Sequence, residues 1–79
     1  MTNEDDELLE AITDQLNAEI GAKGLSMRQF AEKLGRPYDS TRNYLRKERA
    51  LPMIVLIEGA RVLDIEVADL IARARQRIQ

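Results

Sequence analysis

The sequence predicts an all-α fold of five helices in one domain that spans residues 1–79. Glycine and proline divide the chain into helix-sized pieces. Apolar residues recur within these pieces at spacings of three and four, which places them on one face of a helix. No segment of four or more residues alternates between polar and apolar side chains as a half-buried strand does. A helical bundle is therefore the expected architecture.

Composition excludes most catalytic and membrane functions. The 79 residues contain no cysteine and no histidine, which removes disulfides, the usual zinc ligands and the imidazole base of most serine or cysteine nucleophiles. The longest apolar run is five residues, 53–57, whereas a membrane-spanning helix needs about 20. The acidic N-terminus does not resemble a secretory signal. We expect a cytoplasmic protein that is not an enzyme and binds no metal, cofactor, small-molecule substrate or membrane.

The first helix is expected over residues 5–22. Leu9, Ile12, Leu16 and Ile20 form one apolar stripe along it. Acidic residues in its opening turn favour the positive end of the helix dipole. We expect residues 1–6 to be a flexible acidic leader to this helix.

The second helix is expected to begin at Ser26 and to stop at Gly35. Ser26 and Gln29 have the spacing of a capping box, and Gly35 suits the left-handed conformation that closes a helix. Pro37 biases Arg36 away from helical geometry, so a tight turn precedes a third helix that begins at residue 37 or 38 and continues to about 47. The inward face of the second helix consists of Met27, Phe30, Ala31 and Leu34.

The fourth helix has Pro52 in its first turn and ends near Leu63, and the fifth spans about 67–78. The side chains expected to face inward from these two helices are Leu56, Ala60, Leu63, Leu70, Ile71 and Ala74.

Projection at 100° per residue gives the third helix two faces. One face packs through Thr41, Tyr44 and Leu45. The opposite face presents a phenol, a carboxylate, an amide and two guanidinium groups, from Tyr38, Asp39, Asn43, Arg42 and Arg46. These groups suit base edges, since arginine pairs with guanine, asparagine with adenine and aspartate with the amino group of cytosine.

The overall charge of −2 hides a segregation of charge along the chain. Residues 1–10 hold five acidic and no basic residues. Residues 28–49 hold seven basic and three acidic residues, a net charge of +4. The middle of the chain is therefore a candidate contact for phosphate, although a solvated helix pair can carry the same local excess.

Residues 26–63 resemble the Cro and lambda-repressor-like helix-turn-helix family, also called Xre-type. In SMRQFAEKLGRPYDSTRNYL, Ala31 resembles the family's small residue and Gly35 its turn glycine. Phe30, Leu34 and Tyr44 resemble the flanking apolar positions. YLRKERALP and VLIEGARVLDIEVADLI are similar to the family's supporting helices. The resemblance implies a five-helix fold that binds operator DNA, usually as a dimer.

The resemblance also implies roles for individual residues. The base-reading candidates on the third helix are Tyr38, Asp39, Ser40, Arg42 and Asn43. The candidate phosphate contacts are Met27, Arg28, Gln29, Arg46, Lys47 and Arg49. For Asp39 the alternative is a dipole or capping role at the helix start, and for Arg28 a surface pair with Glu32.

Three positions depart from the family pattern. Thr41 stands where the family prefers valine or isoleucine, so its hydroxyl is expected to bond a carbonyl one turn back. Lys47 and Asp64 stand where many relatives have glycine, so a different cap is expected at both.

The expected function is that of a transcriptional regulator, a repressor of phage or plasmid type that occupies double-stranded operator DNA. Ile54, Ile57 and Ile65 exceed what the inward stripe needs, which motivates the hypothesis of a homodimer through the fourth and fifth helices. For the C-terminal Arg73, Arg75 and Arg77, the helix dipole is the first explanation, and a dimer contact or a further phosphate contact is the alternative. The alternative function is a protein-binding helical module, antirepressor- or antitoxin-like, that does not read DNA.

Overall fold

The structure, a computed structural model, describes residues 4–79 and confirms an all-α fold. This part of the chain forms five helices and no strand. They are α1 (Glu4–Ala22), α2 (Met27–Leu34), α3 (Tyr38–Leu45), α4 (Met53–Val62) and α5 (Val67–Gln76). No helix among these residues combines the length and the apolar character needed to cross a bilayer.

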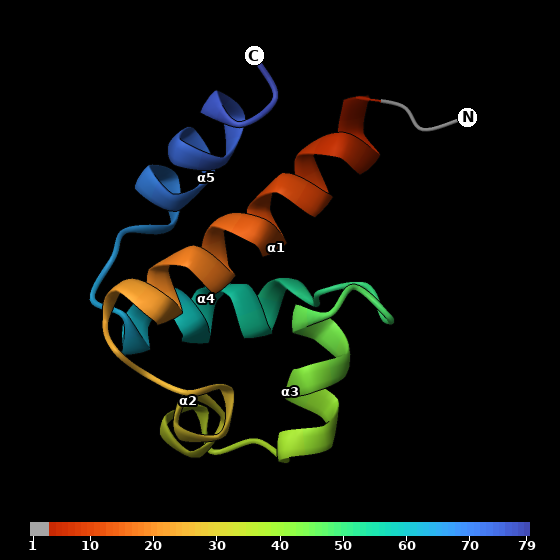
Figure 1. Ribbon diagram of the computed structural model, residues 1–79. Helices are drawn as coiled ribbons and strands as arrows, with labels where there is room; N and C mark the ends of the chain where they lie inside the picture. Colours follow the sequence, from red (N-terminus) through yellow and green to blue (C-terminus); the bar gives the residue numbers. More distant parts are fainter. Residues whose placement is uncertain (1–3) are drawn as a thin grey trace.

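The helices are arranged around α1 and α4 (Figure 1). The long α1 runs diagonally across the molecule, and α5 packs antiparallel to it in their most extensive contact. α4 passes behind α1, and α2 and α3 lie below α4 in this view. α2 packs against both α3 and α4, while α3 also contacts α1. This arrangement leaves one side of α3 facing away from the other helices.

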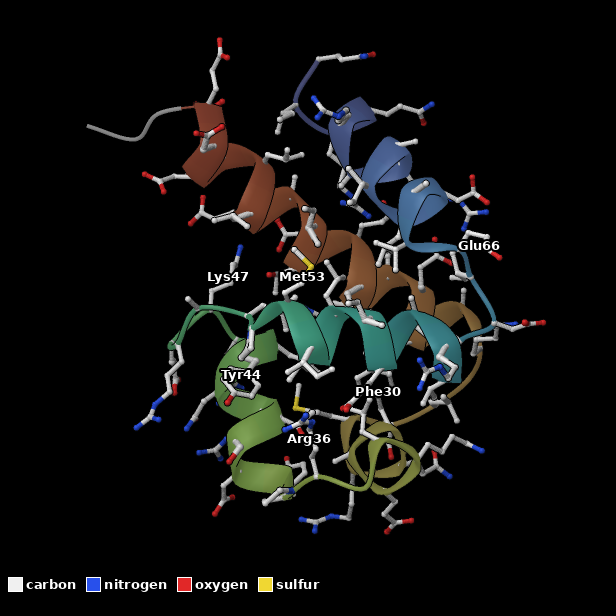
Figure 2. The ribbon with its side chains drawn as sticks, turned by 180° about the vertical axis from the view of Figure 1, so that it is seen from behind. Phe30, Arg36, Tyr44, Lys47, Met53 and Glu66 are labelled. Atoms are coloured by element: carbon white, nitrogen blue, oxygen red, sulfur yellow. The ribbon has the colours of Figure 1, made fainter. Side chains whose placement is uncertain are left out.

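Side chains from all five helices meet in one core. The largest fully buried residues are Phe30, Leu16, Leu63, Leu70, Val55 and Thr41. Phe30 points from α2 toward α4 (Figure 2). There it lies against Gly59, where a Cβ atom would approach the ring Cζ to 3.1 Å. The absence of a side chain at Gly59 therefore lets α2 and α4 pack closely.

Most of the predicted inward residues are confirmed, but the prediction for Leu9 is wrong. Phe30, Ala31, Leu56 and Leu70 are among the buried residues, whereas the side chain of Leu9 is 56% exposed. Leu9 lies in the first half of α1, on the side that faces the open end of the α3–α4 loop rather than the core. The apolar stripe of α1 therefore continues beyond the surface that the other helices cover.

Each of α1 to α4 ends in the same hydrogen-bonding pattern, a Schellman motif. The residue just past the left-handed position donates its backbone N–H to the carbonyl five residues earlier: Leu25 to Ile20, Arg36 to Ala31, Glu48 to Asn43 and Ile65 to Ala60. Glycine occupies the left-handed position after α1 and α2, at Gly24 and Gly35. Lys47 and Asp64 occupy it after α3 and α4, with φ of 63° and 57°. The expectation of a different cap at Lys47 and Asp64 is therefore wrong.

Several helix limits differ from the expected ones. α3 ends at Leu45 because Lys47 leaves helical geometry, and α5 ends at Gln76. Pro52 precedes α4 as its N-cap instead of lying in its first turn. Residues 4–6 of the expected flexible leader belong to α1, while residues 1–3 lie outside the described part of the chain.

Candidate nucleic-acid interface

The inner face of α3 holds the helix against the core as predicted. Thr41 and Leu45 are buried and Tyr44 is half-buried. The Thr41 hydroxyl donates to the Pro37 carbonyl at 2.9 Å, one turn back, which confirms how the helix seam accommodates this polar residue. The hydroxyl is thus satisfied within its own helix, and Thr41 packs like an apolar side chain.

The C-terminal end of α3 is bound to α1 by a residue that sequence reasoning missed. The Asn17 Nδ2 atom donates to the Leu45 carbonyl at 2.9 Å and to the Thr13 carbonyl at 3.2 Å. One of the carbonyls that α3 leaves unpaired at its end is thereby satisfied. The only signal in the sequence is that Asn17 follows the inward-facing Thr13 by one turn, next to the apolar stripe.

The outer face of α3 carries the predicted base-reading residues. Asp39 is exposed, as is Arg46 at the end of the helix, whereas Ser40, Arg42 and Asn43 are half-buried between them. Tyr38 is also half-buried. The structure therefore brings the five predicted base-reading residues together on one short helix, with its carboxylate and terminal guanidinium most accessible.

Arg42 has an unusual environment on this face. Its Nε atom is buried and is the one such side-chain nitrogen or oxygen in residues 4–79 without a hydrogen-bond partner. Arg42 as a whole is half-buried, so the residue reaches the surface while its inner N–H is left unpaired. A buried donor without an acceptor costs about 1–3 kcal/mol, so the fold tolerates Arg42 at the expense of stability.

The start of α2 lies beside the start of α3. The guanidinium carbon of Arg28 is 4.2 Å from the centre of the Tyr38 ring, a cation–π contact that replaces the alternative pair with Glu32. The predicted capping box is present, because Gln29 N–H donates to Ser26 Oγ at 3.0 Å and Ser26 N–H to Gln29 Oε1 at 2.8 Å. These bonds occupy the backbone N–H and side-chain oxygen of Gln29. The backbone N–H groups of Met27 and Arg28, in the first turn, have no acceptor within the helix.

Two of the basic residues in 28–49 are neutralised by other helices. Arg36 Nε is 2.6 Å from Glu58 Oε1, and Lys47 Nζ is 2.9 Å from Asp14 Oδ1. These contacts raise the pKa of Arg36 and of Lys47 and lower the pKa of Glu58. Segment 28–49 keeps its net charge of +4, but together with its two partners Glu58 and Asp14 the charge is only +2.

The predicted phosphate contacts do not all face the same way. Lys47 extends from the α3–α4 loop toward α1, on the side opposite to α2 (Figure 2). Arg46 and Arg49 are exposed, and Arg49 has no ion-pair partner within residues 4–79. The structure therefore gathers Arg28 and Arg46 with the outer face of α3, directs Lys47 away from it and places Arg49 on the loop between.

The outer face of α3 offers hydrogen-bond donors and acceptors. Residues 4–79 contain no group of acidic side chains that could hold a metal ion. Comparison with known proteins adds no relative, since no protein-family model, curated protein or solved structure matches this chain.

Proposed function

We propose that this protein is a sequence-specific DNA-binding regulator of the helix-turn-helix type, similar to Cro and lambda repressor, that represses transcription by occupying an operator. The observation that carries the proposal is the outer face of α3. A carboxylate, an amide and two guanidinium groups project there from one helix, which is held by its other face against α1 and α2.

The dimensions of α3 suit a major groove. An α-helix with its side chains is about 10–12 Å in diameter and fits a major groove about 12 Å wide, and the eight residues of α3 extend for roughly 12 Å along it. The start of α2, with Arg28 stacked on Tyr38, lies beside the start of α3, which supports a role for it in contacting the adjacent phosphates. The function requires no cofactor and no catalytic group.

The contacts divide into two classes. Arg42 and Asn43 would read base edges, with Tyr38, Asp39 and Ser40 beside them. Arg28, Arg46 and Arg49 would neutralise phosphates and release counterions, together with the first-turn N–H groups of α2. Lys47 contributes less than the sequence suggests, because its ammonium group must first leave Asp14.

Binding titrations against a randomised operator library test this division. Arg42→Ala or Asn43→Ala should relax preference at particular base pairs, by about 1–3 kcal/mol of discrimination per contact. Arg49→Ala should weaken binding to all sequences alike and reduce the salt slope by about 1. Lys47→Ala should change the slope less than Arg49→Ala.

The exposed Arg75 on α5 provides the matched control, since Arg75→Ala removes the same charge far from α3 and should leave binding unchanged. Equal losses on every sequence for the Arg42, Asn43 and Arg49 variants would contradict the division of roles.

The second candidate is a protein-binding module that uses the same fold without reading DNA. The two ion pairs of the 28–49 segment favour it, because the segment and its partners Glu58 and Asp14 together carry a charge of only +2. A gel shift against genomic fragments separates the two functions. The module predicts no retardation even at low salt, whereas the regulator binds all fragments weakly through phosphate contacts.

A further inference from the structure

A largely apolar groove lies between the first half of α1, the α3–α4 loop and the start of α4. It has a volume of about 490 Å³, and its apolar lining includes Leu9, Ile12, Leu51, Met53, Leu56 and Ile71. The side chains of Leu9 and Met53 are mostly exposed, at 56% and 64%. Met53 lies between α4 and α1 (Figure 2). Apolar side chains gathered at one place on the surface of a small protein indicate a contact surface.

The charged residues around this apolar centre are more acidic than basic in their effect. The α1 edge of the groove holds Asp6 and Glu10. The loop edge holds Lys47 and Arg49. Asp14, one turn beyond Glu10, binds the Lys47 ammonium group at 2.9 Å, so this positive charge is neutralised within the chain. Arg49 is then the one cation of the lining without an ion pair in residues 4–79.

The excess of negative charge distinguishes between the possible occupants of the groove. Asp5 adds to it, because it precedes Leu9 by four residues and so lies on the same side of α1. DNA and an anionic membrane surface would be repelled by this edge. A second copy of the chain would bring the same excess of carboxylates, with a single Arg49 to meet them. A basic occupant with an apolar face is complementary to both parts of the groove.

The length of the groove suits a helix. Its lining on α1 runs from Asp6 to Thr13, which is roughly 12 Å of helix. Two turns of a partner helix cover this length, and its side chains at positions i, i+3 or i+4 and i+7 would meet the apolar centre. No residue of α3 lines the groove, so the outer face of α3 stays open when the groove is filled.

We propose that this groove binds a basic amphipathic helix of another protein. The apolar face of that helix covers Leu9 and Met53, and its lysine or arginine side chains meet the carboxylates of the α1 edge. This site goes beyond the proposed DNA binding, because it lies apart from the outer face of α3. It also differs from the alternative protein-binding function, because DNA and the helix can be bound at once. The groove is small, so binding is weak.

A synthetic peptide of leucine and lysine, patterned as an amphipathic helix of about 15 residues, tests the groove. Titrated into the full chain without DNA, it should bind with a dissociation constant on the order of 100 µM. In amide NMR spectra, the largest shifts should fall on residues around Leu9 and Met53. The same peptide with glutamine in place of lysine should bind at least about threefold more weakly, and the peptide with glutamate should not bind.

Variants of the groove test each part of the contact. Met53→Lys and Leu9→Lys should each raise the dissociation constant of the leucine–lysine peptide at least about tenfold, because both place a positive charge at the apolar centre. Ile78→Lys is the matched control, since Ile78 is 44% exposed and lies outside the groove. Glu10→Gln should weaken binding about threefold, whereas Glu66→Gln, at the exposed residue before α5, should leave it unchanged.

Three results would overturn the proposal. Shifts centred on α3 would place the peptide elsewhere, and equal affinity for the lysine and glutamine peptides would remove the role of the acidic edge. Self-association of the wild type that Met53→Lys abolishes, measured by sedimentation, would show that a second copy fills the groove. Failure of the peptide to bind refutes the groove alone, whereas failure of the operator titrations refutes the proposed function alone.

Discussion

At the scale of single residues, Arg42 combines a structural cost with a place on the outer face of α3. Its buried Nε–H has no acceptor in the described part of the chain, and native folds seldom keep such a group without a reason. Methionine would retain most of the aliphatic stem and remove the unpaired donor. We therefore expect Arg42→Met to raise the free energy of unfolding by about 1 kcal/mol in urea titrations while it relaxes sequence preference at the base pairs that Arg42 contacts.

Arg46→Met is the matched control for this substitution. Arg46 is exposed, so its replacement should change the free energy of unfolding by less than about 0.5 kcal/mol. A marked loss of stability in Arg42→Met would show that the guanidinium supports the fold, and the argument that it is kept for binding would no longer hold.

Gly21 and Gly59 both lie in helices, but only Gly59 is needed for close packing between helices. Gly21 in α1 has no atom within 4 Å of an added Cβ, so Gly21→Ala should raise the free energy of unfolding by about 0.5–1 kcal/mol. At Gly59 the same methyl would lie 3.1 Å from the ring Cζ of Phe30, which is fully buried, so the ring would have to shift within the core. Gly59→Ala should therefore lower the free energy of unfolding by about 1–3 kcal/mol. Thermal melts of the two variants check the prediction: Gly21→Ala should raise the melting temperature and Gly59→Ala should lower it. Equal shifts in melting temperature would contradict the packing argument.

At the scale of helices, the left-handed residues that close α3 and α4 store strain. Side chains other than glycine adopt this conformation at a cost, although aspartate tolerates it better than most residues. Asp64→Gly keeps the Schellman hydrogen bond from Ile65 to Ala60 and relieves the strain. We expect it to raise the free energy of unfolding by about 0.5–1 kcal/mol, as measured by chemical denaturation.

Asp69→Gly provides the control for the cap substitution. Asp69 lies in the first turn of α5, where glycine brings its entropic cost and also removes a carboxylate from the positive end of the helix, so this variant should lose about 1–2 kcal/mol. If both variants lose stability, the positive φ at Asp64 is not a source of strain.

The sequence predicts the helices well because their signals are local. Ser26, Gly35 and Pro37 determine the ends of α2 and the start of α3 through bonds and angles within a few residues. The end of α3 could not be predicted in this way, since Lys47 carries none of the usual marks of a left-handed cap. The exposure of Leu9 depends on how far other helices extend over α1, which no periodicity in α1 itself records.

In the candidate interface too, contacts between residues distant in sequence could not be predicted. The two faces of α3 follow from its own spacing, so the sequence could assign them. The bond from Asn17 to Leu45 and the pairing of Lys47 with Asp14 join residues 28 and 33 positions apart. Such partners can be identified only when the packing of α1 is known. The pairing with Asp14 makes Lys47 less available to DNA than its position in the sequence suggests.

At the scale of the whole molecule, ion pairs join helices that are distant in sequence. Glu19 Oε2 accepts from Arg73 at 2.8 Å and joins α1 to α5, while Arg36 and Glu58 join the α2–α3 turn to α4. Arg77 also donates to Gln15, at 2.7 Å. For Arg73 and Arg77, these contacts with α1 give a more specific role than the helix dipole does. Without disulfides, such contacts add to a core of modest size.

The carboxylates in these pairs predict how stability depends on pH. The hydrogen bond from Arg73, and a second one from Gln15, lower the pKa of Glu19 below its ordinary value of 4.5, and the hydrogen bond from Arg36 does the same for Glu58. A carboxyl group with a lowered pKa in the folded state contributes its stability above the unfolded pKa. That contribution is lost as the pH falls below about 4.5 through the folded pKa.

We therefore expect the melting temperature to be steady near pH 6 and to fall progressively as the pH drops from about 4.5 toward 3. In the double variant Glu19→Gln/Glu58→Gln, the melting temperature should fall less steeply below pH 4.5, because two of the titrating carboxyl groups are gone. The control is Glu48→Gln, since Glu48 is exposed and has no ion-pair partner within residues 4–79, and it should keep the steep limb. If the double variant loses stability as steeply as the wild type, the acid sensitivity has another origin and the two ion pairs do not link the helices energetically.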